Sequence, residues 1–365
     1  MIKVCILTSV HSRTDTRIFI KQCRSLAAHG YDVTLIVADN FENEFKEGVK
    51  IVDVGRWPGR LNRMFKTTSR VFKKAVELES DIYHLHDPEL MPIGLKLKRL
   101  GKKVIFDSHE DLPKAILSKQ YLGPVSARVL LSATTSLFER YACRRFDGII
   151  AATPFIRDKF LAINPNTVDI NNYPMIGELD AAVPWAEKRD EICYVGGIAA
   201  IRGAFEMVEA IGKVGCGLLL AGNIESGIES RLRKMPGWRY VEALGFIDRS
   251  GVQDVTARSM GGLVLFHPEP NHINAQPNKI FEYMSAGIPV IASNFPLWKE
   301  IIEGNECGLC VEPLDPKEIA AAIDQLVNNP NLARSMGENG RRAILEKYNW
   351  PIEAEKLLKF YAALV

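Results

Sequence analysis

The chain lacks the features that mark membrane-spanning, disulfide-stabilised and disordered proteins. No apolar run among its 365 residues reaches transmembrane length, and no low-complexity tract interrupts it. The seven cysteines are an odd number scattered mostly within apolar runs, which favours reduced core thiols in a cytoplasmic protein. With 47% apolar and 25% charged residues, the sequence is long enough for two soluble α/β domains.

Two short segments have alternatives that the residues argue against. The N-terminal run MIKVCILTSV has no basic region before it and no cleavage site, so it is predicted to be a buried first strand rather than a signal peptide. Cys307 and Cys310 form a CxxC motif, but a redox motif needs its first cysteine at a helix N-terminus. Their surroundings, CGLCVEPLDP, predict a strand that enters a loop, and therefore two structural cysteines.

The formal net charge of +2 conceals a basic first half. Residues 1 to 185 carry 27 Lys and Arg against 21 Asp and Glu, whereas the remainder carries 19 against 23. Much of the excess lies in segment 56–74, where cations alternate with large apolar side chains. Such a segment suits an anionic membrane surface, although a solvated helix with its apolar side in the core fits equally well. Nucleic acid is not expected as a partner, because no known binding motif accompanies the charge.

Apolar strands alternate with helical stretches through both halves of the chain. This order predicts, in each half, a parallel sheet covered by helices on both faces. The alternation breaks near residues 164–189, which contain several Pro and Asn residues. We therefore expect an N-terminal domain at 1–170, a linker at 171–189, a second domain at 190–349 and a terminal amphipathic helix at 350–365.

The residues that directly follow the predicted strands are unusually polar. Ligands of open parallel sheets bind beyond the carboxyl ends of the strands, so these residues carry the most weight. In the first half they are His11, Arg13, Asp15, Arg17, His84, His86, Asp87, Glu89, His109, Glu110 and Asp111. In the second half they are Gly196, Gly197, Arg202, Gly203, Glu269, Asn271, His272, Asn274 and Asn278. Two facing sheets with polar strand ends predict an interdomain cleft.

Two of these polar clusters have more than one interpretation. His84 and His86 lie two residues apart on a strand and share a face, which would suit a metal pair. The following DPELMP offers a capping Asp and a helix-starting Pro, and favours a structural or acceptor-lining role instead. Asp15 and Arg17 could close over an anionic acceptor or simply cap the first helix, and we expect a mixed role.

The segment 274–293, NAQPNKIFEYMSAGIPVIAS, is the most informative in the chain. Pro277 fits the first turn of a helix, and a Gly and a Pro close that helix about ten residues later. The free amides of the helix N-terminus, reinforced by Lys279, form a phosphate cradle. Glu282 lies one turn on and on the same face, where a carboxylate can accept hydrogen bonds from a vicinal diol. Phosphate and ribose diol together indicate a nucleotide; the alternative is an ordinary helix with surface Lys and Glu.

At this point the residues resemble those of retaining glycosyltransferases with the GT-B fold, in family 4, the group 1 glycosyltransferases. The resemblance covers essentially the whole chain and rests on GGIAAIRG, LAGN, PNKIFEYMSAGIPVIAS and ECGLCVEPLDP in the expected order. It implies two Rossmann-like domains that face each other across a cleft, with the terminal helix crossing back to the first domain. It also implies transfer of a sugar from a nucleoside diphosphate sugar, held by the C-terminal domain, to an acceptor hydroxyl, held by the N-terminal domain.

The resemblance assigns roles residue by residue. The residues expected to be catalytic are His109, Arg202 and Lys279. The residues expected to bind the donor are Gly196, Gly197, Arg202, Asn223, Ile247, Asn274, Pro277, Asn278, Lys279 and Glu282. The residues expected to bind the acceptor are His11, Asp15, Arg17, His86, Asp87, His109 and Glu110. Cations and helix amides would stabilise the leaving diphosphate, so neither a metal ion nor another cofactor is expected.

Two positions depart from the family pattern. Gly197 stands where the family commonly has an Arg after the strand glycine, so Arg202 is the local cation of that loop. Asn274 replaces the first of two glutamates eight residues apart, the one that contacts hydroxyls of the donor sugar. Glu282 keeps the second place, which binds the ribose diol. The sequence therefore indicates a nucleotide without identifying the sugar.

Rival functions stay open on the same scaffold. A sugar-nucleotide epimerase or a glycosyl phosphorylase would have the same two domains. A nucleotide-sugar-binding subunit that has lost turnover would also explain Gly197 and Asn274. We expect the transferase, acting on a glycan or lipid-linked acceptor in the assembly of bacterial surface polysaccharide or another glycoconjugate. Its expected place is the cytoplasm, with possible peripheral attachment to the inner face of the membrane.

Overall fold

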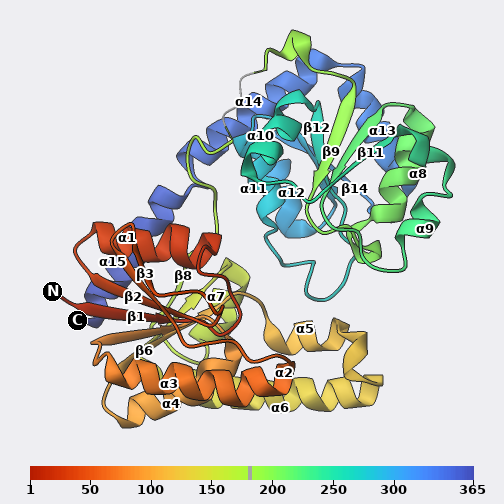
Figure 1. The fold of residues 1–365 in the computed structure, drawn as a ribbon. Coiled ribbons are helices and arrows are strands. Elements are labelled where there is room, and N and C mark those ends of the chain that lie inside the picture. Colours follow the sequence, from red (N-terminus) through yellow and green to blue (C-terminus); the bar gives the residue numbers. More distant parts are fainter. Residues whose placement is uncertain (180–182) are drawn as a thin grey trace. The chain divides into compact units, whose positions relative to one another are not determined.

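The computed structural model describes residues 1–179 and 183–365, which fold into two compact units (Figure 1). Unit 1 contains Met1–Asn172 together with Trp350–Val365, and unit 2 contains Tyr173–Asn349. Each unit has its own sheet and its own hydrophobic core. The linker expected at 171–189 includes residues 180–182, which lie outside the described part of the chain.

Unit 1 is built on an eight-stranded sheet with the order β3-β4-β2-β1-β5-β6-β7-β8. The strands are β1 (Lys3–Leu7), β2 (Asp32–Val37), β3 (Glu44–Lys46), β4 (Val49–Asp53), β5 (Ile82–Leu85), β6 (Lys103–Ser108), β7 (Gly148–Ala151) and β8 (Thr167–Asp169). Strand pairs are parallel except for the antiparallel pair of β3 and β4 at one edge. The central strands are apolar along their whole length because helices cover both faces of the sheet.

The helices of unit 1 lie on both faces of this sheet, with α1 and α15 on one side and α3, α4 and α6 on the other (Figure 1). They are η1 (Thr16–Cys23), α1 (Arg24–Ala28), α2 (Arg60–Asn62), η2 (Arg63–Thr67), α3 (Thr68–Glu77), η3 (Pro88–Leu90), α4 (Met91–Arg99), α5 (Leu112–Ser118), η4 (Gln120–Leu122), α6 (Val125–Cys143), α7 (Pro154–Leu161) and α15 (Trp350–Leu364). The first helical stretch of the chain is divided in two, since η1 is π-helical and α1 is α-helical. No helix in the described parts of the chain is long and apolar enough to cross a bilayer.

The C-terminal helix α15 belongs to unit 1, where aromatic side chains fix it. Tyr361 is fully buried and its hydroxyl lies 2.8 Å from His84 Nδ1. Trp350 is 2% exposed and donates from its indole nitrogen to Ser25 Oγ at 2.9 Å. Burying side chains of this size stabilises the folded state by about 1.5–3 kcal/mol each. This packing accounts for the return of the chain to unit 1.

Unit 2 is built on a six-stranded parallel sheet with the order β11-β10-β9-β12-β13-β14. The strands are β9 (Glu191–Val195), β10 (Gly217–Ala221), β11 (Val241–Gly245), β12 (Gly261–Val264), β13 (Val290–Ser293) and β14 (Gly308–Val311). The helices are η5 (Trp185–Glu187), η6 (Ala200–Arg202), α8 (Ala204–Val214), α9 (Glu229–Leu232), η7 (Pro236–Tyr240), α10 (Arg249–Arg258), α11 (Asn278–Ser285), α12 (Pro296–Ile302), α13 (Pro316–Val327) and α14 (Pro330–Glu346).

Both sheets reverse the direction of strand addition beside their first strand. In unit 1, β2 and β4 extend the sheet on one side of β1, and β5 to β8 extend it on the other. In unit 2, β10 and β11 lie on one side of β9, and β12 to β14 lie on the other. Doubly wound sheets bind ligands at such a switch point, beyond the carboxyl ends of the strands. The topology therefore directs attention to the ends of β1 and β5 in unit 1, and of β9 and β12 in unit 2.

The CxxC motif lies in unit 2, where its thiols are shielded. Cys307 is buried just before β14, and Cys310 is half-buried within that strand. Burial raises the pKa of each thiol to about 12, so neither is a thiolate near neutral pH. The structural interpretation of these cysteines agrees with this environment.

Candidate functional site

A glycine turn follows β9 at the switch point of unit 2. Gly196 and Gly203 have φ values of 128° and 78°, in the region that glycine alone adopts readily. A Cβ at Gly196 would lie 2.5 Å from Lys279 Nζ, and a Cβ at Gly203 would lie 2.3 Å from the carbonyl oxygen of Leu265. The glycines therefore allow two other elements to approach the turn closely.

Two cations converge on this turn. Arg202, at the end of η6, donates from Nη1 to the carbonyl oxygen of Gly197 at 3.2 Å. Lys279, in the first turn of α11, places Nζ 5.7 Å from the centroid of the Phe266 ring, and Arg202 Cζ lies 5.6 Å from the same centroid. Neither cation forms an ion pair within residues 1–179 and 183–365. Burial and the Arg202 charge lower the pKa of Lys279 to about 8.

The N-terminus of α11 adds backbone donors to the same place. The helix starts at Asn278, directly after Pro277, whose ψ of 130° is extended and whose side chain provides no cap. An uncapped helix N-terminus carries unsatisfied amides and a partial positive charge, and it binds anions. Arg202, Lys279 and this helix start together suit a diphosphate.

Glu282, one turn further along α11, already has a partner that the sequence did not reveal. Arg249, the first residue of α10, donates from Nη1 to Glu282 Oε1 at 2.7 Å and from Nε to Glu178 Oε1 at 2.8 Å. These three residues are far apart in the chain, so no spacing pattern could have joined them. A vicinal diol that binds Glu282 must share or replace the Arg249 contact.

The remaining residues of the expected donor site lie around this centre. Asn223 is exposed beyond β10, and its carbonyl oxygen accepts from Ile198 N at 2.9 Å, which ties LAGN to the glycine turn. Ile247, after β11, packs against the core cluster beneath α11. Asn274 is half-buried in loop 267–277, which the Trp298 indole anchors through the carbonyl oxygen of Ala275 at 2.7 Å.

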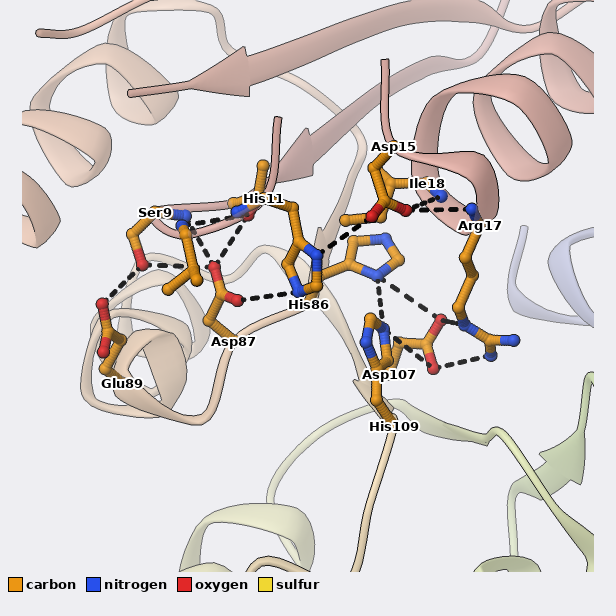
Figure 2. A network of polar contacts seen from close by, with 12 residues as sticks. Ser9, His11, Asp15, Arg17, Ile18, His86, Asp87, Glu89, Asp107 and His109 are labelled. Atoms are coloured by element: carbon orange, nitrogen blue, oxygen red, sulfur yellow. Dashed lines mark hydrogen bonds and ion pairs between the residues drawn. The ribbon is translucent and has the colours of Figure 1, made fainter. Parts of the chain in front are cut away.

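Unit 1 contains a cluster of polar side chains beyond β1, β5 and β6 (Figure 2). Its centre is Asp107, a fully buried carboxylate near the end of β6. Arg17 donates to it through Nε at 3.0 Å and Nη2 at 2.8 Å, and Gln22 donates at 2.8 Å. Although burial opposes ionisation, the Arg17 guanidinium holds the pKa of the Asp107 carboxyl well below its usual range.

This ion pair corrects one expectation for the acceptor site. Arg17 is 5% exposed, and its remaining nitrogen donates to the carbonyl oxygen of Ile170 at 2.8 Å. Arg17 therefore supports the fold instead of meeting an acceptor. Asp15 caps η1 by accepting from the amides of Arg17 and Ile18 at 2.9 Å each, and its other oxygen lies 3.1 Å from His11 Nδ1.

His86 and Asp87, both expected at the acceptor, are also buried in this cluster. Asp87 accepts from Thr8 Oγ1 at 2.9 Å and from the amide of Ser9 at 2.6 Å. His86 Nδ1 lies 3.1 Å from His109 Nε2 (Figure 2). These two residues therefore lie beneath the exposed side chains of the cluster. The expectation that they contact the acceptor is corrected, because their burial gives them a supporting role instead.

His11 and His109 are the histidines of the cluster that reach the surface. Their side chains are 29% and 25% exposed, and their ring centroids lie 5.2 Å apart. Burial lowers the pKa of His109 to about 4, so its imidazole is neutral near neutral pH. The hydrogen bond to Asp15 raises the pKa of His11. Glu110, the next residue along, is exposed. The accessible part of the predicted acceptor site therefore consists of His11, Asp15, His109 and Glu110, since the Asp15 side chain is 25% exposed.

The same cluster holds the three side chains with the spacing of a metal site. Possible ligand atoms of His84, His86 and Asp107 all lie within 4.8 Å of one another. Asp107 is already paired with Arg17, however, and a metal ion would have to share that carboxylate with a guanidinium at about the same place. Because like charges repel strongly in a buried site, the chemistry favours the ion pair over a metal.

Comparison with known proteins agrees with both halves of this description. Two doubly wound domains, the second with a cationic glycine turn, are the arrangement of the GT-B fold. The family model described as Glycosyltransferase Family 4 matches residues 17–170, and the model described as Glycosyl transferases group 1 matches residues 176–343. The chain belongs to the group 1, family 4 glycosyltransferases, and the predicted family is confirmed.

Solved structures confirm the predicted fold. The sucrose-phosphate synthase of Thermosynechococcus elongatus matches with a TM-score of 0.80 at 19% identity, over 100% of this chain and 99% of that one. The Anabaena protein HepE, solved in complex with UDP-glucose, matches with a TM-score of 0.77 at 13% identity, over 100% of both chains. Among curated proteins, the phosphatidyl-myo-inositol mannosyltransferase of Mycobacterium leprae is 22% identical over 302 residues, 80% of this chain and 76% of the relative.

Proposed function

We propose that this glycosyltransferase moves a sugar from a nucleoside diphosphate sugar to an acceptor hydroxyl, with retention of anomeric configuration and without a metal ion. The observation that carries the proposal is the convergence of Arg202, Lys279 and the uncapped start of α11 on one glycine turn. The chain supplies cations and amides there, and no carboxylate of its described residues forms an ion pair with either cation. The structure of HepE with UDP-glucose shows that this fold accommodates such a donor.

The chemistry requires stabilisation of two charges. As the bond between the anomeric carbon and the phosphate oxygen breaks, negative charge develops on the leaving diphosphate and positive charge on the sugar ring. Arg202 can form two parallel hydrogen bonds to a phosphate, and Lys279 adds a compact point charge. Preorganised donors of this kind stabilise the developing charge, which is the role that a metal ion has in other enzymes.

On the acceptor side, the role of His109 is to orient a reacting hydroxyl. His109 is neutral and partly exposed, with His86 behind it, and it can hydrogen-bond a hydroxyl of the sugar or the acceptor. In a retaining transfer the new bond forms on the face from which the diphosphate departs. A phosphate oxygen of the leaving group then receives the proton of the acceptor hydroxyl, so the step needs no additional base.

For the acceptor we propose a lipid-linked glycan at an anionic membrane surface, in surface polysaccharide or glycoconjugate assembly. Two observations support this choice. The basic segment 56–74 lies in unit 1, the unit that also contains His11 and His109. The Mycobacterium leprae relative is a mannosyltransferase that acts on a phosphatidyl-inositol.

A panel of nucleotide sugars, scored first by thermal shift, tests the proposal. A donor at 100 times its Kd should stabilise the protein by about 2.7 kcal/mol. The donor that binds is then incubated with glycan acceptors in excess EDTA, and the anomeric configuration of the product is determined by NMR. We expect turnover in EDTA with the configuration of the donor. Donor conversion without an acceptor would indicate an epimerase, a requirement for phosphate would indicate a phosphorylase, and binding without any product would indicate an inactive subunit.

A further inference from the structure

The long helix α6 of unit 1 carries its large apolar side chains outward. Between residues 128 and 139 its inward positions, at a spacing of three to four residues, are polar or charged: Arg128, Ser132, Thr135 and Glu139. Ser132 Oγ, for example, donates to the carbonyl oxygen of Pro113 at 2.8 Å, towards α5. Only its C-terminal end, at Ala142 and Cys143, buries apolar side chains in the described structure. On the opposite face, Leu130, Leu137 and Tyr141 are 65%, 70% and 47% exposed. An ordinary domain helix has the reverse arrangement, so the outer face of α6 lacks the partner that its composition requires.

The charge around this face is of one sign. Glu139 is the acidic residue of α6, and it is 1% exposed and paired with Lys159 inside the unit. Arg140 and Arg144, near the C-terminal end of the helix, are exposed. Apolar side chains and cations thus share the outer face without an exposed carboxylate on the helix.

A cavity of about 490 Å³ lies at the other end of the same region. The lining residues that bear on its chemistry are Arg56, Trp57, Arg60, Arg63, Lys119 and Tyr121. Arg63 is neutralised by Glu89 through contacts of 2.8 and 3.1 Å, and Lys119 lies 3.5 Å from Glu110. Arg56 and Arg60 form no ion pair with the described residues, so two positive charges in the pocket lack an anion.

The pocket and the helix form a continuous region. Tyr121 belongs to η4, which contacts α6 directly. On the other wall, Leu61 and Phe65 follow Arg60 and are 71% and 69% exposed. In Figure 1, α6 runs along the same side of unit 1 as α3 and α4, and it contacts α4 directly. Exposed apolar side chains therefore flank an electropositive hollow.

Exposed apolar side chains beside unpaired cations fit an anionic bilayer better than a second copy of the chain. A second copy of the chain would place the same cations against each other, and like charges across an interface are unfavourable. An anionic bilayer offers phosphates for the cations, an acyl boundary for Leu and Phe side chains, and an interface that suits Trp and Tyr. We propose that the outer face of α6 and the pocket at Arg56 and Arg60 dock unit 1 on an anionic lipid bilayer, with a headgroup phosphate in the pocket. The inference rests on the proposed function, because it locates the contact with the membrane that carries the acceptor.

Co-sedimentation of the full chain with phosphatidylcholine vesicles, with and without phosphatidylglycerol, tests the inference. We expect binding at low salt only when phosphatidylglycerol is present. The double variant Arg56→Gln, Arg60→Gln should bind about 30-fold more weakly, since each cation near an anionic surface contributes about fivefold. The double variant Leu130→Ser, Leu137→Ser should lose about tenfold or more.

Matched variants in unit 2 control for general effects of charge and hydrophobicity. Arg239→Gln with Arg342→Gln, and Leu314→Ser with Leu345→Ser, remove exposed residues of the same types, and binding should be unchanged. The fluorescence of Trp57, isolated by subtracting the spectrum of a Trp57→Phe variant, should shift to the blue on anionic vesicles. This second measurement uses the wild-type surface and does not depend on how the charge and leucine variants fold.

The outcomes separate this inference from the proposed function. Equal losses in the unit 2 controls, or an unchanged Trp57 spectrum on vesicles that bind the protein, would overturn the docking surface while the membrane acceptor stands. Failure of the wild-type protein to bind anionic vesicles would overturn the inference. The transferase activity would then be tested separately, by measuring donor turnover with a soluble acceptor. Dimers that dissociate in the leucine variant would show that a second copy, not lipid, covers α6.

Discussion

The switch points of the two units present buried or half-buried charge in opposite ways. In unit 1, Arg17 is met by Asp107 at 2.8 Å, and the carboxylate has further donors around it. In unit 2, Arg202 and Lys279 approach one glycine turn, and no carboxylate of the described residues pairs with either. A buried charge that has its partner within the chain is satisfied by folding. A cation without such a partner gains its stabilisation only when an anion binds. The comparison thus separates charges that are paired within the fold from charges that we propose bind the diphosphate of the donor.

The largest expected effect concerns the buried ion pair between Arg17 and Asp107 in unit 1. Asp107→Ala removes the carboxylate and leaves the Arg17 guanidinium buried without a counter-charge. Breaking a buried ion pair in this way destabilises a protein by about 3–5 kcal/mol. Urea unfolding should show this loss of stability in unit 1. The two units need not unfold together, so unfolding is followed with a probe in each unit.

A double variant sharpens the same test. Replacing both partners, as Asp107→Leu with Arg17→Met, removes the pair without leaving an unpaired charge, and it should recover much of the lost stability. Arg202→Ala in unit 2 serves as the comparison and should change the free energy of unfolding by less than about 0.5 kcal/mol. If Asp107→Ala unfolded at the same urea concentration as wild type, the ion pair would not be the structural element inferred from its geometry.

The second prediction concerns Arg202 and Lys279, two cations of unit 2 that form no ion pair with the described residues. Arg202→Ala and Lys279→Ala should each lower turnover of the donor by about 10² to 10³-fold, because each removes a group that stabilises the leaving diphosphate. Neither should lower the melting temperature of the unliganded protein, since neither cation is paired in the fold. Steady-state kinetics with the donor identified by thermal shift measures this, with Arg239→Ala, an exposed arginine of the same unit, as the control. Turnover within a few-fold of wild type in both variants would remove the diphosphate assignment.

The sequence predicted the proposed diphosphate site of unit 2 but not the buried ion pair of unit 1. The donor helix could be predicted because Pro277, Lys279 and Glu282 lie within six residues of one another, where helix geometry fixes their relation. The role of Arg17 could not, since its partner Asp107 is distant in the chain and sits inside the apolar strand KVIFDSH. Only the tertiary fold brings the Arg17 side chain of η1 to the end of β6.

Other features depended on tertiary structure in the same way. Arg249 reaches Glu282 because α10 and α11 are neighbours in space, and no local pattern encodes that. The apolar residues of α6 have helical periodicity, and this predicts an apolar face without saying whether that face points inward. Alternation of strands and helices did suffice for the fold class, because burial on both faces of a parallel sheet leaves a distinct pattern in the strands themselves.

The pH dependence of the donor step gives a third test. The pKa of Lys279 is about 8 in the unliganded protein, so the side chain is charged below that pH and loses its charge above it. The kcat/KM for the donor should therefore be level below about pH 8 and fall by up to about tenfold per pH unit above it. His109, with a pKa of about 4, should add no change between these values. The profile of Lys279→Arg should stay level, since Arg keeps its charge; a fall that persists in this variant would belong to another group.

The smallest expected effect concerns the one carboxylate of the donor site that is already paired. Arg249 and Glu282 are 48% and 20% exposed, and ion pairs of such accessibility contribute about 0.2–1 kcal/mol. A ribose diol that binds Glu282 must displace or share this contact, so Arg249→Ala should strengthen nucleotide binding by up to about fivefold. Isothermal titration with the nucleoside diphosphate measures the change. Glu178→Gln, which leaves the contact between Arg249 and Glu282 in place, should have a smaller effect. Weaker binding in Arg249→Ala would instead group Arg249 with Arg202 and Lys279, the cations that we propose contact the donor itself.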